Sequence, residues 1–416
     1  MLLAAWAAAE DYRWLPAPFR PDPAPVSIAP ARALALADEP AFELLPGGNL
    51  GGADHAFELH PKGLLSVGWD GNPQASPEPS PGLLLLGIAG AEARLSGGDR
   101  WRLDGNGQID IRQYPGGEGA NSVGGSLGLG LLVRDQTWWY RPEASWTRDS
   151  EPLAATALAV ERNDWNGSLS AGREGRRAGC SARIAVHGTN YLEDADGFIA
   201  DDEDVRSLHG DVAAWLVAWS RSEIGTRLGG DTLVYPHGEI RTDGRGLRGN
   251  LWWRHQPGDR CWITLEAGAT AWRWDADTAD NPANDDANLL MPVGALRLEW
   301  RPEERSRLIL ALSQDVAPGA VSNSARIVAL TGTGRLRLAD RTAAFFAGRV
   351  ERRTDSGAPL GQPVEVRRNT VVRGGLEHEL RDGIAGRLML GWDDIEGEVG
   401  VSSTRPSIAV EMAAAF

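Results

Sequence analysis

Hydrophobic and polar residues alternate along most of this chain. From His60 to Phe416, apolar side chains recur at every second position in runs that are separated by short polar turns and longer polar loops. The clearest run has one apolar and one charged face: Leu296, Leu298 and Trp300 against Arg297, Glu299 and Arg301. Successive side chains of a β-strand point to opposite sides, so a period of two indicates strands. The pattern therefore predicts an all-β fold.

Short and long connections alternate between these strands. The short turns lie near residues 97–100, 134–136, 257–259, 302–304, 339–341 and 381–383, and long loops cover about 70–82, 191–205, 275–288, 317–323, 354–363 and 396–405. Outer-membrane barrels have short turns at one end and long loops at the other. We therefore predict a transmembrane up-and-down antiparallel β-barrel of about 18 strands. The number is open at residues 153–178, which we interpret as one long strand and a turn at 172–175. Sixteen strands is therefore the alternative.

The N-terminal part of the chain differs from the rest. Residues 1–9 read MLLAAWAAA, which is typical of the end of a secretory signal peptide, although a short apolar helix is the alternative. Residues 10–58 are rich in Pro and Ala, and we interpret them as an N-terminal segment in the periplasm. Residues 59–416 form the predicted barrel.

Tryptophan is unusually frequent in this sequence. There are 17 Trp against 7 Phe and 5 Tyr. Many lie near predicted strand ends: Trp69, Trp101, Trp138, Trp139, Trp252, Trp253, Trp272, Trp274, Trp300 and Trp392. Amphipathic rings collect where a bilayer meets water. We therefore expect an aromatic girdle around the barrel.

The last nine residues carry the most specific motif. Every second residue from Ile408 is apolar and shares one face: Ile408, Val410, Met412, Ala414 and Phe416. This ending resembles the insertion signal of Gram-negative outer-membrane barrels, a final alternating strand with a C-terminal aromatic. The resemblance implies an outer-membrane location with both termini in the periplasm. It also implies outer-membrane lipid and the barrel-assembly machinery as partners.

A second resemblance concerns the start of the barrel. The segment LLSVGWDGNP, residues 64–73, places an aromatic residue before an Asp–x–Asn sequence at the end of an apolar strand. It is similar to the first strand of β-barrel porins that are associated with exopolysaccharide export loci. This resemblance implies a pore, with polysaccharide as a candidate partner.

Composition excludes several other classes. The chain has 416 residues and a net charge of −15, which disfavours nucleic acid as a partner. The two cysteines, Cys180 and Cys261, are too few for a disulfide framework. No metal-binding His motif is present, and Ser207 and His209 are a serine–histidine pair two residues apart on one strand face. We expect a protein that is not an enzyme and needs no cofactor.

Acidic residues concentrate in two predicted outer loops. The first contains Glu193, Asp194, Asp196, Asp201 and Asp202, and the second contains Asp275, Asp277, Asp280, Asp285 and Asp286. Closely spaced carboxylates supply the oxygen ligands that Ca²⁺ requires. The first loop is therefore a candidate Ca²⁺ site, and a simple solvated loop is the alternative.

The charged faces of the strands identify the candidate pore lining. A charge on the lipid face costs about 2–4 kcal/mol at the bilayer midplane, so these residues must face the lumen. They are Arg297, Glu299, Arg301, Arg335, Arg337, Arg349, Glu351, Arg353, Arg373, Glu377 and Arg387. The sequence leaves open whether they line a water-filled pore or fill the barrel with Arg–carboxylate ladders.

The leading hypothesis is an outer-membrane pore for passive diffusion or export of polar solutes or polysaccharide. The alternative is a closed surface barrel with a structural or adhesive role, in which acidic cation-binding loops are the working part. A soluble all-β protein is the third reading, and it would place polar residues on the outer face.

Overall fold

The described part of the chain is almost entirely β-strand. The computed structural model describes residues 26–28, 42–44, 57–72, 81–97, 100–115, 121–135, 137–152, 159–175, 177–192, 204–236, 242–275, 288–303, 306–317, 324–356, 364, 366–397 and 402–415. The strands are β1 (Val26–Ile28), β2 (Phe42–Leu44), β3 (Phe57–Asp70), β4 (Gly82–Gly97), β5 (Trp101–Gln113), β6 (Ser122–Asp135), β7 (Trp138–Pro152), β8 (Ala159–Glu174), β9 (Ala178–Tyr191), β10 (Val205–Trp219), β11 (Ser222–Val234), β12 (Gly244–Gly258), β13 (Cys261–Trp274), β14 (Asn288–Glu303), β15 (Ser306–Ala317), β16 (Ala325–Ala339), β17 (Thr342–Asp355), β18 (Val366–Arg381), β19 (Ile384–Gly397) and β20 (Ser403–Ala415). Within these residues, no helix is long and apolar enough to cross a membrane.

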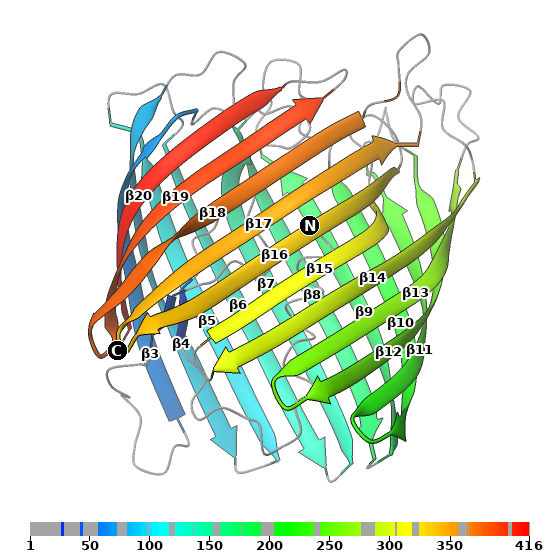
Figure 1. The fold of residues 1–416 in the computed structure, drawn as a ribbon. Coiled ribbons are helices and arrows are strands. Elements are labelled where there is room, and N and C mark those ends of the chain that lie inside the picture. Colours follow the sequence, from blue (N-terminus) through cyan, green and yellow to red (C-terminus); the bar gives the residue numbers. More distant parts are fainter. Residues whose placement is uncertain are drawn as a thin grey trace.

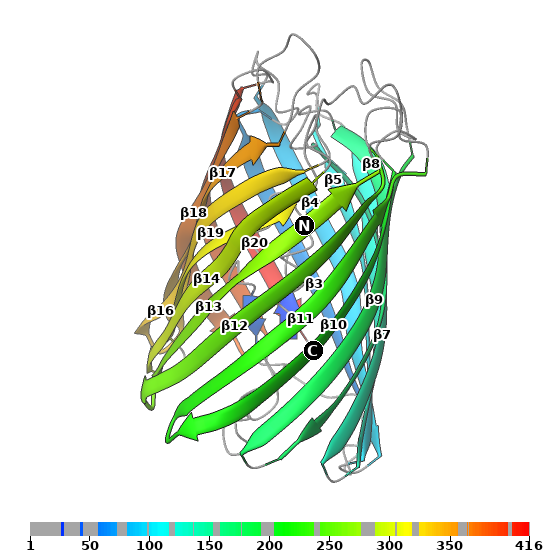
Figure 2. The same ribbon diagram turned by 90° about the vertical axis from the view of Figure 1, so that its right-hand side faces the viewer.

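Strands β3 to β20 form one closed antiparallel barrel (Figures 1 and 2). Each strand pairs with its neighbours in sequence, and β20 returns to pair with β3, from Ser407 opposite Asp70 to Ala415 opposite Lys62. The predicted up-and-down barrel of 18 strands is therefore confirmed. The turn predicted at 172–175 is displaced, because β8 continues to Glu174.

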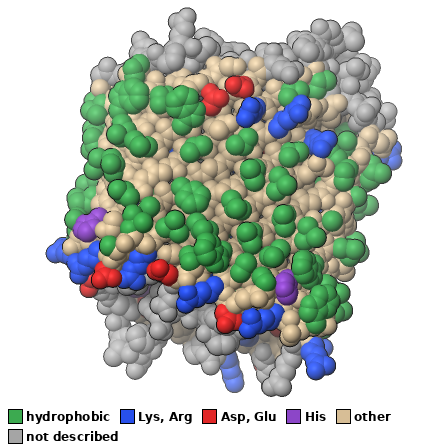
Figure 3. All heavy atoms as spheres, in the orientation of Figure 1, with side chains coloured by type: hydrophobic (Ala, Val, Ile, Leu, Met, Phe, Trp, Pro, Cys, Tyr) green, Lys and Arg blue, Asp and Glu red, His purple; other side chains and the backbone are tan. Residues whose placement is uncertain are grey.

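The two faces of the barrel wall have opposite chemistry. On β14, Leu296 and Leu298 are exposed on the outside, whereas Arg297 and Glu299 between them are half-buried on the inside. Hydrophobic side chains spread across the middle of the outer surface, and charged side chains gather toward its two ends (Figure 3). An outer face of this kind suits hydrocarbon rather than water, which removes the soluble all-β reading.

The tryptophans divide between the two faces. Trp69, Trp101, Trp138, Trp300 and Trp392 are exposed on the outside, as a girdle requires. Trp139, Trp272 and Trp274 are instead buried on the inner face. The girdle prediction was therefore wrong for these three, because their positions have the parity of inward residues. Trp252 has the same parity, since it lies two residues after the buried Asn250 on β12. Trp272 and Trp274 stack on each other with ring centroids 5.1 Å apart.

Hydrogen bonds between successive hairpins connect the short-turn end of the barrel. The carbonyl oxygen of Arg221 accepts from the amide of Gln256 at 2.9 Å, and that of Arg341 accepts from Glu379 at 2.8 Å. The same contact links Gly383 to Ala415 at 2.8 Å, beside the closing strand. These bonds satisfy backbone groups at the rim, where the regular ladder ends.

The short strands β1 and β2 pair antiparallel with each other, with Ser27 opposite Glu43. Strand β1 contacts β3, and β2 contacts β19 and β20, so this small sheet lies against the closing seam. Residues 57 and 58, predicted to belong to the N-terminal segment, are part of β3. The other residues of that segment, and those of the signal-peptide region, lie outside the described residues. Their predicted roles stay predictions.

The alternation of faces predicts how introduced thiols will react. In a Cys180→Ser/Cys261→Ser background in membranes, Arg297→Cys should react rapidly with a water-soluble maleimide, and Leu296→Cys should not. The two positions are adjacent in sequence and differ only in the face they occupy. Reaction of Leu296→Cys but not of Arg297→Cys would invert the inside and outside of the barrel.

Candidate functional site

One carboxylate on the inner wall of β14 gathers three arginines. Glu299 accepts hydrogen bonds from Arg301 Nε at 2.8 Å and from Arg307 Nε at 3.0 Å, and Arg297 Nη2 lies 4.0 Å away. The Arg301 guanidinium also lies over the Trp262 ring, 5.2 Å from its centroid. Three positive charges around one negative charge leave this part of the wall locally positive.

A second ion-pair network crosses β16, β18, β19 and β20. Glu377 accepts from Arg335 and from Arg387, each at 2.8 Å, and Arg387 lies 3.9 Å from Glu411. The Arg387 guanidinium sits 4.3 Å from the centroid of Phe345. The side chains of Arg387, Glu377 and Glu411 are only 2%, 4% and 1% exposed. Buried charges are stable only when they are paired, and here each one is.

The remaining predicted lining residues form local pairs. Arg349 pairs with Glu351, Arg353 lies 3.7 Å from Asp355, and Arg373 lies 3.3 Å from Asp393. Arg337 differs, because it pairs at 2.5 Å with the exposed Asp340 in a short turn. The structure thus places Arg337 at the rim and the other ten predicted residues along the inner wall. Their role in lining a pore remains a prediction.

The opposite inner wall carries a cluster that sequence reasoning did not identify. His209 on β10 lies between two carboxylates, with Nδ1 2.6 Å from Asp231 and Nε2 3.2 Å from Asp211. Arg227 lies 3.6 Å from Asp211 and 4.0 Å from Glu266. Only the doubly protonated imidazolium donates from both nitrogens, so this arrangement favours a charged ring. Neither nitrogen is left to act as a base toward Ser207.

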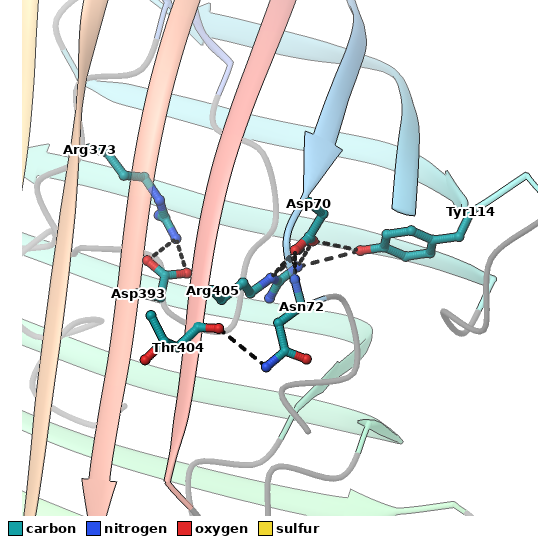
Figure 4. A network of polar contacts seen from close by, with 7 residues as sticks. All are labelled: Asp70, Asn72, Tyr114, Arg373, Asp393, Thr404 and Arg405. Carbon is teal, nitrogen blue, oxygen red and sulfur yellow. Dashed lines mark hydrogen bonds and ion pairs between the residues drawn. The ribbon is translucent and has the colours of Figure 1, made fainter. Parts of the chain in front are cut away.

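A third cluster joins the first and last barrel strands at the end with the long loops (Figure 4). Asp70, at the end of β3, is 1% exposed and accepts from Arg405 Nε of β20 at 2.9 Å. The Arg405 Nη2 atom lies 2.5 Å from the same carboxylate, and the Tyr114 hydroxyl donates to it at 3.2 Å. The Asn72 side-chain amide donates to the Thr404 carbonyl at 3.3 Å.

The segment Trp69–Asn72, which carries the porin resemblance, therefore closes the barrel. Gly71 donates its amide to the Pro406 carbonyl at 2.8 Å, and a Cβ at this position would lie 2.7 Å from Pro406 Cγ. Only glycine permits that approach. Burial raises the pKa of the Tyr114 hydroxyl, and Asp70 adds to this effect against the opposing pull of Arg405, so Tyr114 remains a donor near neutral pH.

The structure describes only some of the residues predicted for the metal site and the insertion signal. Glu193, Asp194, Asp196, Asp201 and Asp202 lie outside the described residues, so the Ca²⁺ prediction stays a prediction. Among residues that the structure does describe, no three His, Cys, Asp or Glu side chains gather as metal ligands. Ile408, Val410 and Met412 are exposed on the outer face of β20, and Ala414 is half-buried on the same face. Phe416 is not among the described residues.

No family model and no curated protein matches this chain. Similar solved structures include OccK2 (OpdF) of Pseudomonas aeruginosa in complex with glucuronate, at 11% identity over 86% of this chain and 98% of that one, with a TM-score of 0.47. OccAB4 of Acinetobacter baumannii is 9% identical over 88% and 100% of the two chains, with a TM-score of 0.46. The alcaligin outer-membrane receptor FauA of Bordetella pertussis is 8% identical over 86% and 76%, with a TM-score of 0.42. The likeness is confined to the architecture of the barrel.

The Asp70–Arg405 ion pair should contribute to the stability of the barrel. Asp70→Asn should lower the free energy of unfolding by about 3–5 kcal/mol, because it leaves the Arg405 charge largely buried without a carboxylate. The matched control is Asp340→Asn, which breaks an exposed pair with Arg337 and should cost under about 1 kcal/mol. Denaturant unfolding in detergent, followed by the heat-dependent gel mobility of the barrel, measures both.

Arg405→Gln completes a double-mutant cycle. If the Asp70–Arg405 pair holds the seam, the double variant should lose less stability than the sum of the two single variants. Additive losses would show that the two residues act independently.

Proposed function

We propose that this protein is an outer-membrane pore through which small polar solutes diffuse. The closed wall of 18 strands, which is apolar outside and charged inside, supports this proposal. Barrels of 16 to 18 strands are wide enough to leave an aqueous channel. Charged inner residues are stable in such a channel because water and opposite charges solvate them.

The barrel has a natural orientation in the membrane. At the end where β3 begins and β20 finishes, successive strands are only a few residues apart in sequence, and at the other end the gaps between strands are longer. In outer-membrane barrels the short turns face the periplasm. We therefore place both barrel termini on the periplasmic side and the Asp70–Arg405 seam toward the cell exterior.

The charges of the inner wall support weak ion selectivity. Arginines and carboxylates alternate as neighbours, as in Arg335–Glu377–Arg387, so neither sign dominates the wall. The cluster around Glu299 is an exception, because it carries an excess of positive charge. Polar and anionic solutes are thus better candidates than apolar ones. Polysaccharide export is a narrower form of the proposal and depends on the resemblance of residues 64–73 alone.

One observation favours a closed barrel as the second candidate. Leu64, Ala413 and Ala415 face inward beside the seam, yet they are at most 1% exposed. The β1–β2 sheet contacts β3 and β20, the strands that carry these residues. A barrel that is filled across its whole section would serve a structural or adhesive function instead.

Planar-bilayer recording of the purified full-length protein separates the two candidates. A pore should give steady, ohmic conductance with little preference between K⁺ and Cl⁻. The triple variant Arg297→Gln/Arg335→Gln/Arg349→Gln should shift the reversal potential toward cation selectivity, because carboxylates such as Glu351 lose their partners.

The control for this recording has the same change of charge outside the lumen. Arg326, Arg352 and Arg368 are exposed on the outer face, so replacing all three with Gln should leave the reversal potential unchanged. A folded barrel that inserts into the bilayer without conductance would favour the closed, structural function.

A further inference from the structure

The outer face of β10, β12 and β13 carries three arginines near the long-loop end. Arg206, Arg245 and Arg273 are all exposed, and we refer to them as the arginine ridge. Arg245 and Arg273 stand directly opposite each other in the β12–β13 pair. Arg206 and Arg245 face Val234 and Thr232 of the intervening β11, two residues apart on the same face. The ridge therefore crosses four adjacent strands.

The ridge marks the boundary of the apolar outer surface. Each arginine has an exposed leucine beside it on the side toward the barrel middle. For Arg206 and Arg245 this leucine is two residues further along the same strand, and for Arg273 it is on the neighbouring strand β14. These leucines are Leu208, Leu247 and Leu290, which are 45%, 71% and 78% exposed. Such exposed leucines suit lipid tails, so the guanidiniums just beyond them lie at the level of the lipid headgroups.

The ridge lacks the carboxylates that accompany arginines inside the barrel. On the inner wall, Arg335, Arg373 and Arg387 each pair with Asp or Glu. On the ridge, the outer-face neighbours across the strands are Val234, Thr232 and Asn288. Among the described residues, none forms a hydrogen bond or ion pair with a ridge guanidinium.

Two like charges directly opposite each other destabilise a sheet. The Arg245–Arg273 pair is therefore unfavourable unless an anion lies between the two side chains. Paired guanidiniums are well suited to phosphate, which accepts several charge-assisted hydrogen bonds from their planar donors. At the depth of the ridge, the available phosphates are those of membrane lipids.

We infer that the arginine ridge is a binding site for the phosphate group of a lipid headgroup in the outer leaflet. The lipid tails then cover Leu208, Leu247 and Leu290, and the phosphate bridges Arg245 and Arg273. This site lies on the outside of the wall and is separate from the inner surface on which the pore proposal depends.

The chain itself contains a competing anion. The acidic loop that holds Asp201 and Asp202 precedes Arg206, and Asp275 follows Arg273 closely in sequence. If these carboxylates neutralise the ridge, lipid phosphate has no site there. Titration with lipid distinguishes that outcome from lipid binding.

The test titrates purified full-length protein in detergent with bisphosphorylated lipid A and counts bound lipid by native mass spectrometry. The double variant Arg245→Gln/Arg273→Gln should bind about tenfold more weakly than the unchanged protein, because two charge-assisted contacts are lost. The matched control is Arg100→Gln/Arg177→Gln, which removes the same charge from exposed positions at the short-turn end. It should alter binding less than about twofold.

Two further arms identify the ligand group. Lipid A without phosphates should bind weakly to the unchanged protein. Its affinity should be about that of intact lipid A for the Arg245→Gln/Arg273→Gln variant. Inorganic phosphate at the concentration of the lipid should not displace it, since the tails contribute to binding. Heat-dependent gel mobility verifies that each variant is folded.

Several outcomes would overturn the inference. Equal weakening by the ridge and control variants would indicate general electrostatic attraction. Absence of lipid binding by the unchanged protein would indicate that the loop carboxylates occupy the ridge. Displacement by inorganic phosphate at equal concentration would assign the site to a soluble anion. Because binding is measured without conductance, none of these outcomes depends on whether the barrel is an open pore.

Discussion

The fold depends on the pairing of its last strand with its first. A sheet edge inside a membrane would expose backbone N–H and C=O groups that hydrocarbon cannot satisfy, and closure of the barrel removes that edge. The β20–β3 ladder supplies these bonds, and the buried Asp70–Arg405 pair holds its end beside the long loops. Gly71 lets the chain approach Pro406 closely enough to continue the contact beyond the ladder. Closure also produces the two separate environments, lipid and lumen, that give each side chain its role.

Much of this architecture follows from the alternation of apolar and polar side chains at every second position. The alternation around Leu296 and Arg297 indicated strands and the face on which charged residues lie, because burying a charge in lipid is costly. The number of strands came from the alternation of short turns and long loops along the chain. The same rule also explains the error over the tryptophans. Trp272 and Trp274 have inward parity and pack against Tyr235 and Leu233, so position near a strand end alone did not locate them. Parity was the stronger signal and was available in the sequence.

The contacts between distant strands could not be predicted in the same way. Asp70 and Arg405 are separated by 335 positions, and His209 meets Asp231 only because the register of β10 and β11 places them opposite each other. The alternation of apolar and polar residues gives the face on which a residue lies but not its partner on the neighbouring strand. Counting back from the C-terminal strand would assign Arg405 to the inner face, yet its pairing with Asp70 requires the closed register.

We propose that water fills a continuous path through the barrel. Swelling of liposomes that contain the purified protein, in isotonic solutions of neutral sugars of increasing size, measures such a path without any influence of charge. A water-filled barrel should give rapid swelling with small sugars and a progressive decline as the sugar becomes larger. Swelling no faster than in protein-free liposomes, with the barrel shown to be folded and inserted, would rule out an open pore.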